Sequence, residues 1–128
     1  MRLALILCLA ASLARAETTM SASEFEAWAT GHTLSYFDGE RLWGSEQHLP
    51  GRATLDADAD GPCTRGSWQP RGDDICFSYD ASPGPHCWRF LHEGGEVFAE
   101  LLGQDAAPRY RVTRSKAPLS CPGPDVGV

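Results

Sequence analysis

The sequence predicts a mainly β protein: an antiparallel up-and-down meander or small barrel of about eight strands, with one short N-terminal helix and two disulfides. Short segments of alternating apolar and polar residues recur from residue 33 onward, which is typical of half-buried strands. Turn-forming residues separate these segments at regular spacing, as in a meander that closes into a barrel. Four cysteines follow the N-terminal segment, and they favour a pair of disulfides.

The first 16 residues have the features of a secretory signal peptide. Arg2 precedes an apolar run over residues 3–13, and Ala14-Arg15-Ala16 follows as an A-x-A cleavage site. The run is shorter than the roughly 20 residues of a membrane span. We therefore expect cleavage after Ala16, a periplasmic or secreted location, and a single β-rich domain over residues 17–128 with an irregular C-terminal tail.

The charge balance argues against nucleic acid as a partner. The chain has 11 basic and 17 acidic residues, and loss of Arg2 and Arg15 with the signal peptide leaves a formal net charge of −8. Proteins that bind nucleic acid carry basic patches instead. We expect no membrane span, and the acidic excess is typical of a solvated surface.

The helix is expected shortly after the cleavage site. Ser21 or Ser23 can cap its N-terminus, Phe25 and Trp28 lie on one face, and Gly31 ends it. This single apolar stripe predicts docking on an outer patch of the sheet or at an open end of the barrel.

Strands begin directly after the helix. The pair Asp38-Gly39 separates two apolar segments and predicts a tight hairpin with Leu34 opposite Trp43. Gly44 is a candidate β-bulge beyond this hairpin.

The segment over residues 63–102 contains most of the aromatic residues. Ile75, Phe77 and Tyr79 alternate with polar residues, so they share one face of a strand. Gly94-Gly95 predicts a two-residue turn between the strand that contains Trp88 and Phe90 and the strand that contains Ala99 and Leu101. The register of this turn places Phe90 opposite Ala99 and Trp88 opposite Leu101, with both pairs facing the inside. On the outer face it predicts an ion pair of Arg89 with Glu100. It also predicts an outer apolar patch formed by Leu91 and Phe98.

The same alternation suggests the disulfide pairing. Cys76 and Cys87 lie on the outer face of adjacent strands, where a cross-strand disulfide is sterically reasonable. Cys63 then pairs with Cys121 by elimination, although four cysteines allow three connectivities. Zinc is the competing explanation for the cysteines, but they contain no C-x-x-C pair.

Several of these residues form a motif. Gly66-Ser67-Trp68, followed by residues 75–79 and Cys87-Trp88, resembles small secreted proteobacterial proteins that are rich in β-structure. The G-x-W element also resembles that of lipocalin-type barrels, where it lies on the first strand, whereas here it lies in the middle of the chain. Neither resemblance implies catalytic residues.

A metal site is suggested by residues 56–61. Asp56, Asp58 and Asp60, followed by Gly61, match the first half of a D-x-D-x-D-G calcium loop, in which alternate carboxylates bind one cation. The twelfth position is Ser67 instead of glutamate, and no helices flank the loop. Calcium is the one cofactor that the sequence suggests, and an acidic hairpin turn is the alternative.

Aromatic residues at a barrel mouth would form a platform for a ligand. The candidates are Trp43, Trp68, Tyr79, Trp88 and His92. Core packing is the alternative explanation for the tryptophans. The sequence shows no G-x-S-x-G motif, and an oxidised cysteine is no nucleophile, so we do not predict an enzyme.

The sequence therefore favours a secreted or periplasmic noncatalytic binding module. Its ligand would be a small apolar molecule at the barrel mouth, or a protein partner on the outer patch. A calcium-binding envelope protein is the first alternative, and a small hydrolase with an acid or a histidine at the mouth is the second.

Overall fold

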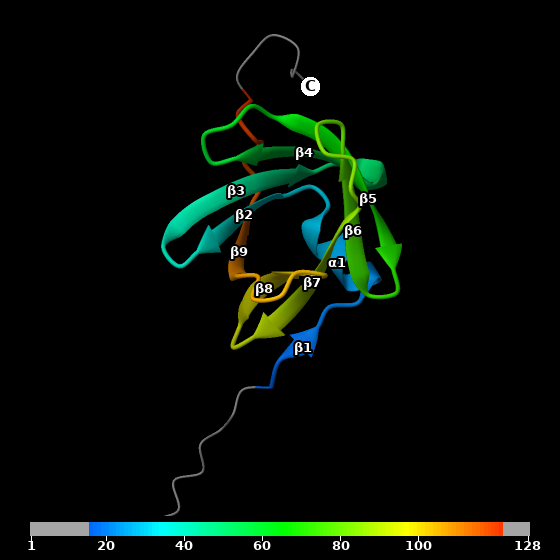
Figure 1. Ribbon diagram of the computed structural model, residues 1–128, viewed down its shortest axis with the longest axis vertical. Helices are drawn as coiled ribbons and strands as arrows, with labels where there is room; N and C mark the ends of the chain where they lie inside the picture. Colours follow the sequence, from blue (N-terminus) through cyan, green and yellow to red (C-terminus); the bar gives the residue numbers. More distant parts are fainter. Residues whose placement is uncertain (1–15, 122–128) are drawn as a thin grey trace, which may run out of the picture.

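The computed structural model describes residues 16–121, which form a closed barrel of eight antiparallel strands, one short helix and two disulfides (Figure 1). The strands are β2 (Thr33–Asp38), β3 (Arg41–His48), β4 (Ala53–Asp58), β5 (Thr64–Arg71), β6 (Asp74–Tyr79), β7 (His86–Glu93), β8 (Glu96–Leu101) and β9 (Arg109–Ser115). Each strand pairs with the next in sequence, and β9 returns to pair with β2. The predicted meander is confirmed, and it closes. Most of the predicted signal peptide and the last seven residues lie outside the described residues.

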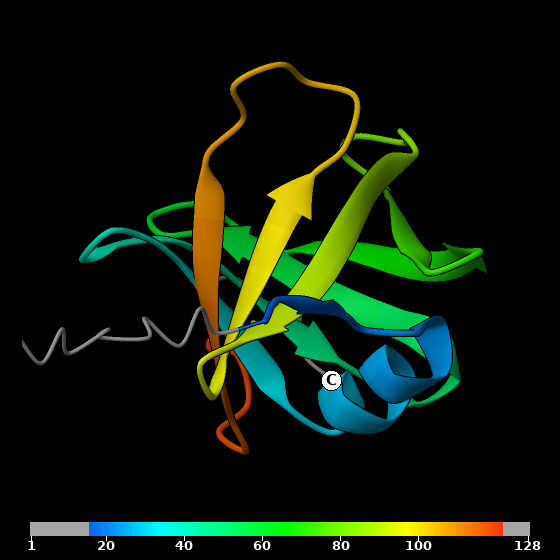
Figure 2. The ribbon, with the colours of Figure 1, turned by 90° about the horizontal axis from the view of Figure 1, so that it is seen from below.

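One end of the barrel is closed by α1 (Ala22–Ala29), which lies opposite the loop between β8 and β9 (Figure 2). The helix begins at Ser21, whose side chain accepts a hydrogen bond from the backbone of Glu24, while the Glu24 carboxylate accepts one from the backbone of Ser21. Phe25 is fully buried, and its ring packs against Trp68 and Phe90. The apolar stripe of the helix therefore docks at the barrel end, one of the two predicted places.

A two-residue strand, β1 (Thr18–Thr19), precedes the helix and pairs with β7. Thr19 lies opposite Leu91, which is only 2% exposed although it faces outward. Phe98, its partner in the predicted patch, lies beneath the guanidinium of Arg109 at 4.4 Å. The predicted outer apolar patch is thus largely covered by the chain itself.

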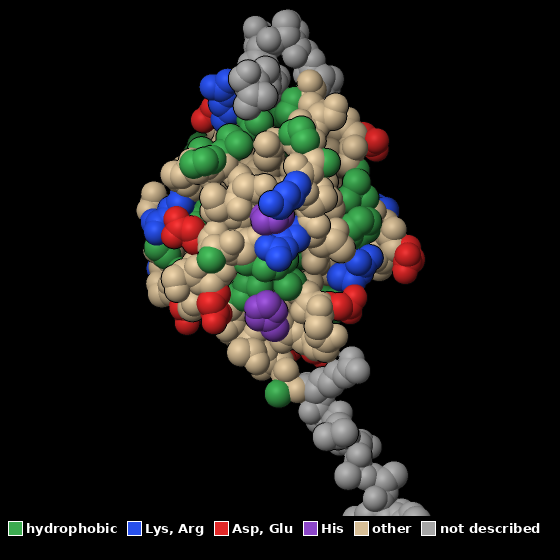
Figure 3. Space-filling view, turned by 180° about the vertical axis from the view of Figure 1, so that it is seen from behind, with side chains coloured by type: hydrophobic (Ala, Val, Ile, Leu, Met, Phe, Trp, Pro, Cys, Tyr) green, Lys and Arg blue, Asp and Glu red, His purple; other side chains and the backbone are tan. Residues whose placement is uncertain are grey.

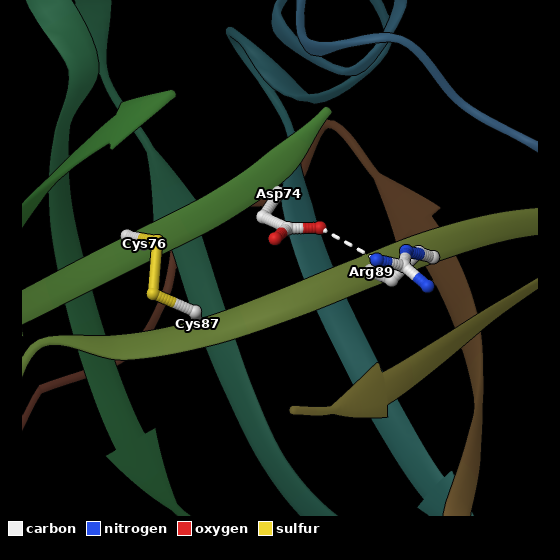
Figure 4. Close-up of a disulfide and its surroundings, with 4 residues drawn as sticks. All are labelled: Asp74, Cys76, Cys87 and Arg89. Carbon is white, nitrogen blue, oxygen red and sulfur yellow. Dashed lines mark hydrogen bonds and ion pairs between the residues drawn. A yellow bond between two sulfur atoms is a disulfide. The ribbon is translucent and has the colours of Figure 1, made fainter. Parts of the chain in front are cut away.

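The register of β7 and β8 is the predicted one, with Phe90 opposite Ala99 and Trp88 opposite Leu101. Arg89 lies opposite Glu100 as predicted, but the predicted ion pair between them is wrong. Arg89 instead donates to Asp74 on the other side, with Nη2 3.0 Å from Oδ1 (Figure 4). A strand inside a barrel has two neighbours, and the sequence gives no means of choosing between them.

The hairpin of β2 and β3 differs from the prediction. Asp38 pairs with Arg41, so the turn is formed by Gly39 and Glu40, and Leu34 lies opposite Glu46 instead of Trp43. A bulge interrupts the register, because Tyr36 pairs with Gly44 and Phe37 pairs with Leu42. Trp43 is the extra residue between these two pairs, one position before the predicted bulge.

Both predicted disulfides are confirmed. Cys76 and Cys87 are directly opposite on β6 and β7, with Cα atoms 3.9 Å apart (Figure 4). Cys63 and Cys121 join the loop before β5 to the C-terminal segment, with Cα atoms 5.5 Å apart. Leu119 in that segment donates its backbone N–H to the Gln47 side chain at 3.0 Å. The disulfide and this hydrogen bond attach the segment to the barrel wall.

The surface carries charges of both signs. On the face in Figure 3, acidic side chains are dispersed, with basic side chains among them. Salt bridges join several of these groups, such as Arg52 with Glu26 and Arg109 with Glu17. Within residues 16–121, no helix has the length and hydropathy needed to cross a membrane.

Candidate ligand-binding site at the barrel mouth

A cavity of about 270 Å³ lies within the barrel at the end opposite α1. Small-molecule sites commonly range from roughly 300 to 1,000 Å³, and this cavity lies just below that range, so it suits only a small ligand. It is lined by side chains from β2, β3, β4, β6, β7 and β8. Because the helix fills the other end, the mouth is the end through which a ligand would enter.

Half of the residues that line the cavity carry aromatic rings. The rings belong to Tyr36, Trp43, Phe77, Tyr79, His86 and Trp88. Several of them contact one another, with ring centroids 5.9 Å apart for Trp43 and Trp88 and 6.3 Å apart for Tyr36 and Trp88. Aromatic pairs at these separations form stable, well-defined surfaces. The lining therefore offers a ligand an apolar wall of rings in contact with one another.

The bulge in β3 determines where Trp43 lies. As the extra residue of the bulge, Trp43 leaves the regular alternation, and bulges commonly redirect a side chain in this way. Its ring stacks on Tyr110 with centroids 4.5 Å apart, while 39% of the residue remains exposed. Trp43 is thus an exposed aromatic side chain at the rim of the cavity.

Three carboxylates share the cavity with the aromatic rings. They belong to Glu46 on β3 and to Asp56 and Asp58 on β4. Glu46 and Asp56 are cross-strand partners on the inner face, where opposing Cβ atoms are about 4.5–5.5 Å apart. Burial, together with the negative charges of Glu46 and Asp58, raises the pKa of Asp56 to about 7. Near neutral pH, the side chain of Asp56 is therefore partly protonated.

Glu46 has two close polar neighbours, although it is only 2% exposed, and one of them makes a hydrogen bond to it. The Tyr79 hydroxyl donates to its Oε2 at 2.7 Å, and His48 Nε2 lies 3.1 Å from its Oε1. Burial and the neighbouring carboxylates of Glu46 and Asp56 raise the pKa of Tyr79 far above its usual range. The phenol therefore stays protonated and keeps donating.

Gly66 on β5 allows this arrangement. It pairs with Tyr79, and a Cβ at position 66 would lie 2.5 Å from the Tyr79 ring and 2.7 Å from the Ser78 carbonyl. Both separations are shorter than van der Waals contact. The glycine of the G-x-W element thus makes room for the tyrosine that holds Glu46.

The structure brings three of the five predicted ligand-binding residues together. Trp43, Tyr79 and Trp88 line the cavity. Trp68 is buried against Phe25 near the helix-capped end. His92 lies at the far end of β7, paired with Thr18, and does not line the cavity.

The predicted calcium ligands are divided between a strand and a turn. Asp56 and Asp58 belong to β4 and line the cavity, whereas Asp60 lies in the exposed turn that follows. Within residues 16–121, no three histidine, cysteine or acidic side chains are grouped as metal ligands. Calcium binding by this segment stays a prediction.

Sequence reasoning did not single out Tyr36 or Glu46, both of which line the cavity. The signal for Glu46 is its parity with His48, because residues two apart in a strand share a face. Buried strand faces are normally apolar, so a Glu and a His there look like solvent-facing residues. Only the closure of the barrel shows that they point inward.

Comparisons with family models, with curated proteins and with solved structures found no match for this chain.

Proposed function

We propose that this protein is a noncatalytic binding module that holds a small, largely apolar ligand in the mouth of its barrel. The observation that supports this proposal most strongly is the aromatic-lined cavity of about 270 Å³. Concave sites with mostly apolar linings and a few polar groups are the usual form of small-molecule sites.

The exposed position of Trp43 adds to this argument. Of the large apolar side chains in the described residues, Leu42 and Trp43 on β3 are those that stay substantially exposed, at 38% and 39%. Trp43 borders the cavity, so a ligand seated there would cover part of its ring. Covering apolar surface stabilises a complex by about 25 cal/mol per Å².

We further propose that the protein acts outside the cytoplasm, in the periplasm or as a secreted protein. Two disulfides support this location, because disulfides persist in oxidising compartments. The N-terminal sequence, with its apolar run and A-x-A site, agrees with export.

Native mass spectrometry of protein purified from the periplasm tests the proposal. We expect a chain that begins at Glu17 and retains a small-molecule adduct. The Trp43→Ala variant should lose the adduct, because it removes the rim of the cavity. The matched control is Leu42→Ala, which removes a similarly exposed neighbour that does not line the cavity.

Two results would overturn the proposal. One is a wild-type protein that carries no adduct and whose tryptophan fluorescence is unchanged by periplasmic small-molecule extract. The other is an adduct that Trp43→Ala retains and Leu42→Ala loses, which would place binding on the outer face of the β2–β3 hairpin.

A further inference from the structure

The cavity has an unbalanced charge. Its lining includes the carboxylates of Glu46, Asp56 and Asp58, but no lysine or arginine among the described residues. His86 is the one basic side chain there, and its Nε2 lies 3.0 Å from the Ser82 hydroxyl. Three acidic groups do not increase the affinity of a site for a purely apolar ligand.

Two of these carboxylates have no counterpart in the protein. Within residues 16–121, no hydrogen bond or salt bridge reaches the side chain of Asp56 or Asp58, whereas Glu46 is held by Tyr79. Asp58 is exposed, whereas Asp56 is half-buried. A carboxylate partly removed from water without a partner is costly, and the negative charges near Asp56 add to that cost. A positive charge between Glu46 and Asp56 would relieve both effects.

The aromatic rings around the carboxylates favour an organic cation over a metal ion. Indole and phenol faces attract ammonium groups through the ring quadrupole, and aromatic pockets are a common solution for quaternary ammonium ligands. Trp43, Trp88 and Tyr36 supply such rings at one cavity. A divalent metal would instead require several oxygen ligands grouped around one point, and no such group is found in the described residues.

From the aromatic rings and carboxylates of this one cavity, and resting on the proposed function, we propose that the ligand is a small organic cation with an ammonium group on an apolar body. The carboxylates of Glu46 and Asp56 balance the charge of the ammonium, and the rings of Trp43 and Trp88 contact both the ammonium and the apolar body. The cavity as a whole, with its rings and its unpaired carboxylates together, forms the recognition site.

A pair of isosteres tests the charge separately from the shape. Choline and 3,3-dimethylbutan-1-ol differ in the replacement of a quaternary nitrogen by carbon, so they have the same apolar shape and only choline is charged. Isothermal titration of the full-length mature protein at pH 8 should show choline binding at least about tenfold more tightly, which corresponds to about 1.4 kcal/mol.

Two variants locate the effect. Asp56→Asn keeps the size of the side chain and removes its charge, so it should reduce choline affinity about tenfold and thereby narrow the difference in affinity between choline and the alcohol. The control is Asp73→Asn, which removes an acid from the turn between β5 and β6, away from the cavity. Thermal unfolding of each variant shows that the fold is intact.

The outcomes separate the two proposals. Equal affinity for choline and the alcohol would overturn the cationic ligand but keep the apolar binding module. Binding of neither probe would count against both proposals. A thermal shift with CaCl₂ but not with choline would also overturn the inference, in favour of the calcium hypothesis.

Discussion

Tyr79 donates its hydroxyl proton to Glu46 inside the barrel, over 2.7 Å, and so connects the aromatic lining of the cavity with its acidic side. The two residues are 33 positions apart and come from β6 and β3. Hydrogen bonds to charged, buried acceptors contribute more than neutral ones, so this contact stabilises both the barrel and the geometry of the site.

Removal of this hydroxyl should be costly. We expect Tyr79→Phe to lower the free energy of unfolding by about 1.5–3 kcal/mol, because the buried Glu46 carboxylate loses a donor. Urea denaturation measures this change. Tyr110→Phe is the control, since no hydrogen bond of its hydroxyl is found within the described residues, and it should have a much smaller effect. Equal losses in the free energy of unfolding of the two variants would show that the hydrogen bond from Tyr79 to Glu46 does not stabilise the protein.

Asp56 should make stability depend on pH. Its pKa is about 7 in the folded protein against 3.8 for the free side chain, so the folded state binds more protons between these values. The free energy of unfolding should therefore fall as pH rises from about 4 to 7 and then level off. Asp56→Asn should flatten this part of the profile and raise the melting temperature at pH 8. A profile unchanged by the substitution would refute the assignment.

The same carboxylate should make cation binding depend on pH. As pH rises from 5.5 to 8.5, Asp56 loses its proton, and choline affinity should increase. Two histidines are neighbours of these carboxylates: His48 lies beside Glu46, and His86 lines the cavity. Titrations of Asp56→Asn and His86→Gln separate the contributions. The expectation fails if the wild-type dependence persists in full in Asp56→Asn.

Gly66→Ala should disturb the site through packing. The added methyl group would lie 2.5 Å from the Tyr79 ring and 2.7 Å from the Ser78 carbonyl oxygen, and the carbonyl belongs to the backbone and cannot move freely. Overpacking of this kind typically costs about 1–3 kcal/mol. We expect lower stability in chemical denaturation together with weaker ligand binding. Gly44→Ala is the milder comparison, because its nearest contact would be 3.1 Å.

Phe25→Ala should destabilise the protein without changing the mouth. Phe25 is fully buried where α1 closes the barrel, and loss of such a side chain costs about 3–5 kcal/mol. Trp28→Ala, on the same helix but only partly buried, should cost less. Ligand affinity measured well below the melting temperature should be retained in both variants. A loss of affinity in Phe25→Ala would contradict this expectation, because it would show that packing at the helix end of the barrel affects binding at the mouth.

Local sequence patterns determined much of the fold. The two-residue turn at Gly94-Gly95 determines the register of β7 and β8, because a turn of given length leaves only one pairing of the residues beside it. The alternation of Ile75, Phe77 and Tyr79 identifies the inner face of β6, and therefore places Cys76 opposite Cys87 on the outer face. The helix likewise begins at Ser21, one of the two caps that the sequence allows.

Closure of the barrel decided what local patterns could not. The extra residue in β3 turns Trp43 to the rim, and the pairing of β3 with β4 places Glu46 beside Asp56. Alternation alone makes Glu46 look like a solvent-facing residue, since polar side chains are normally expected outside. Sequence pattern reports on neighbours along the chain, whereas the charge and shape of the cavity arise from residues of six strands that meet only when β9 pairs with β2.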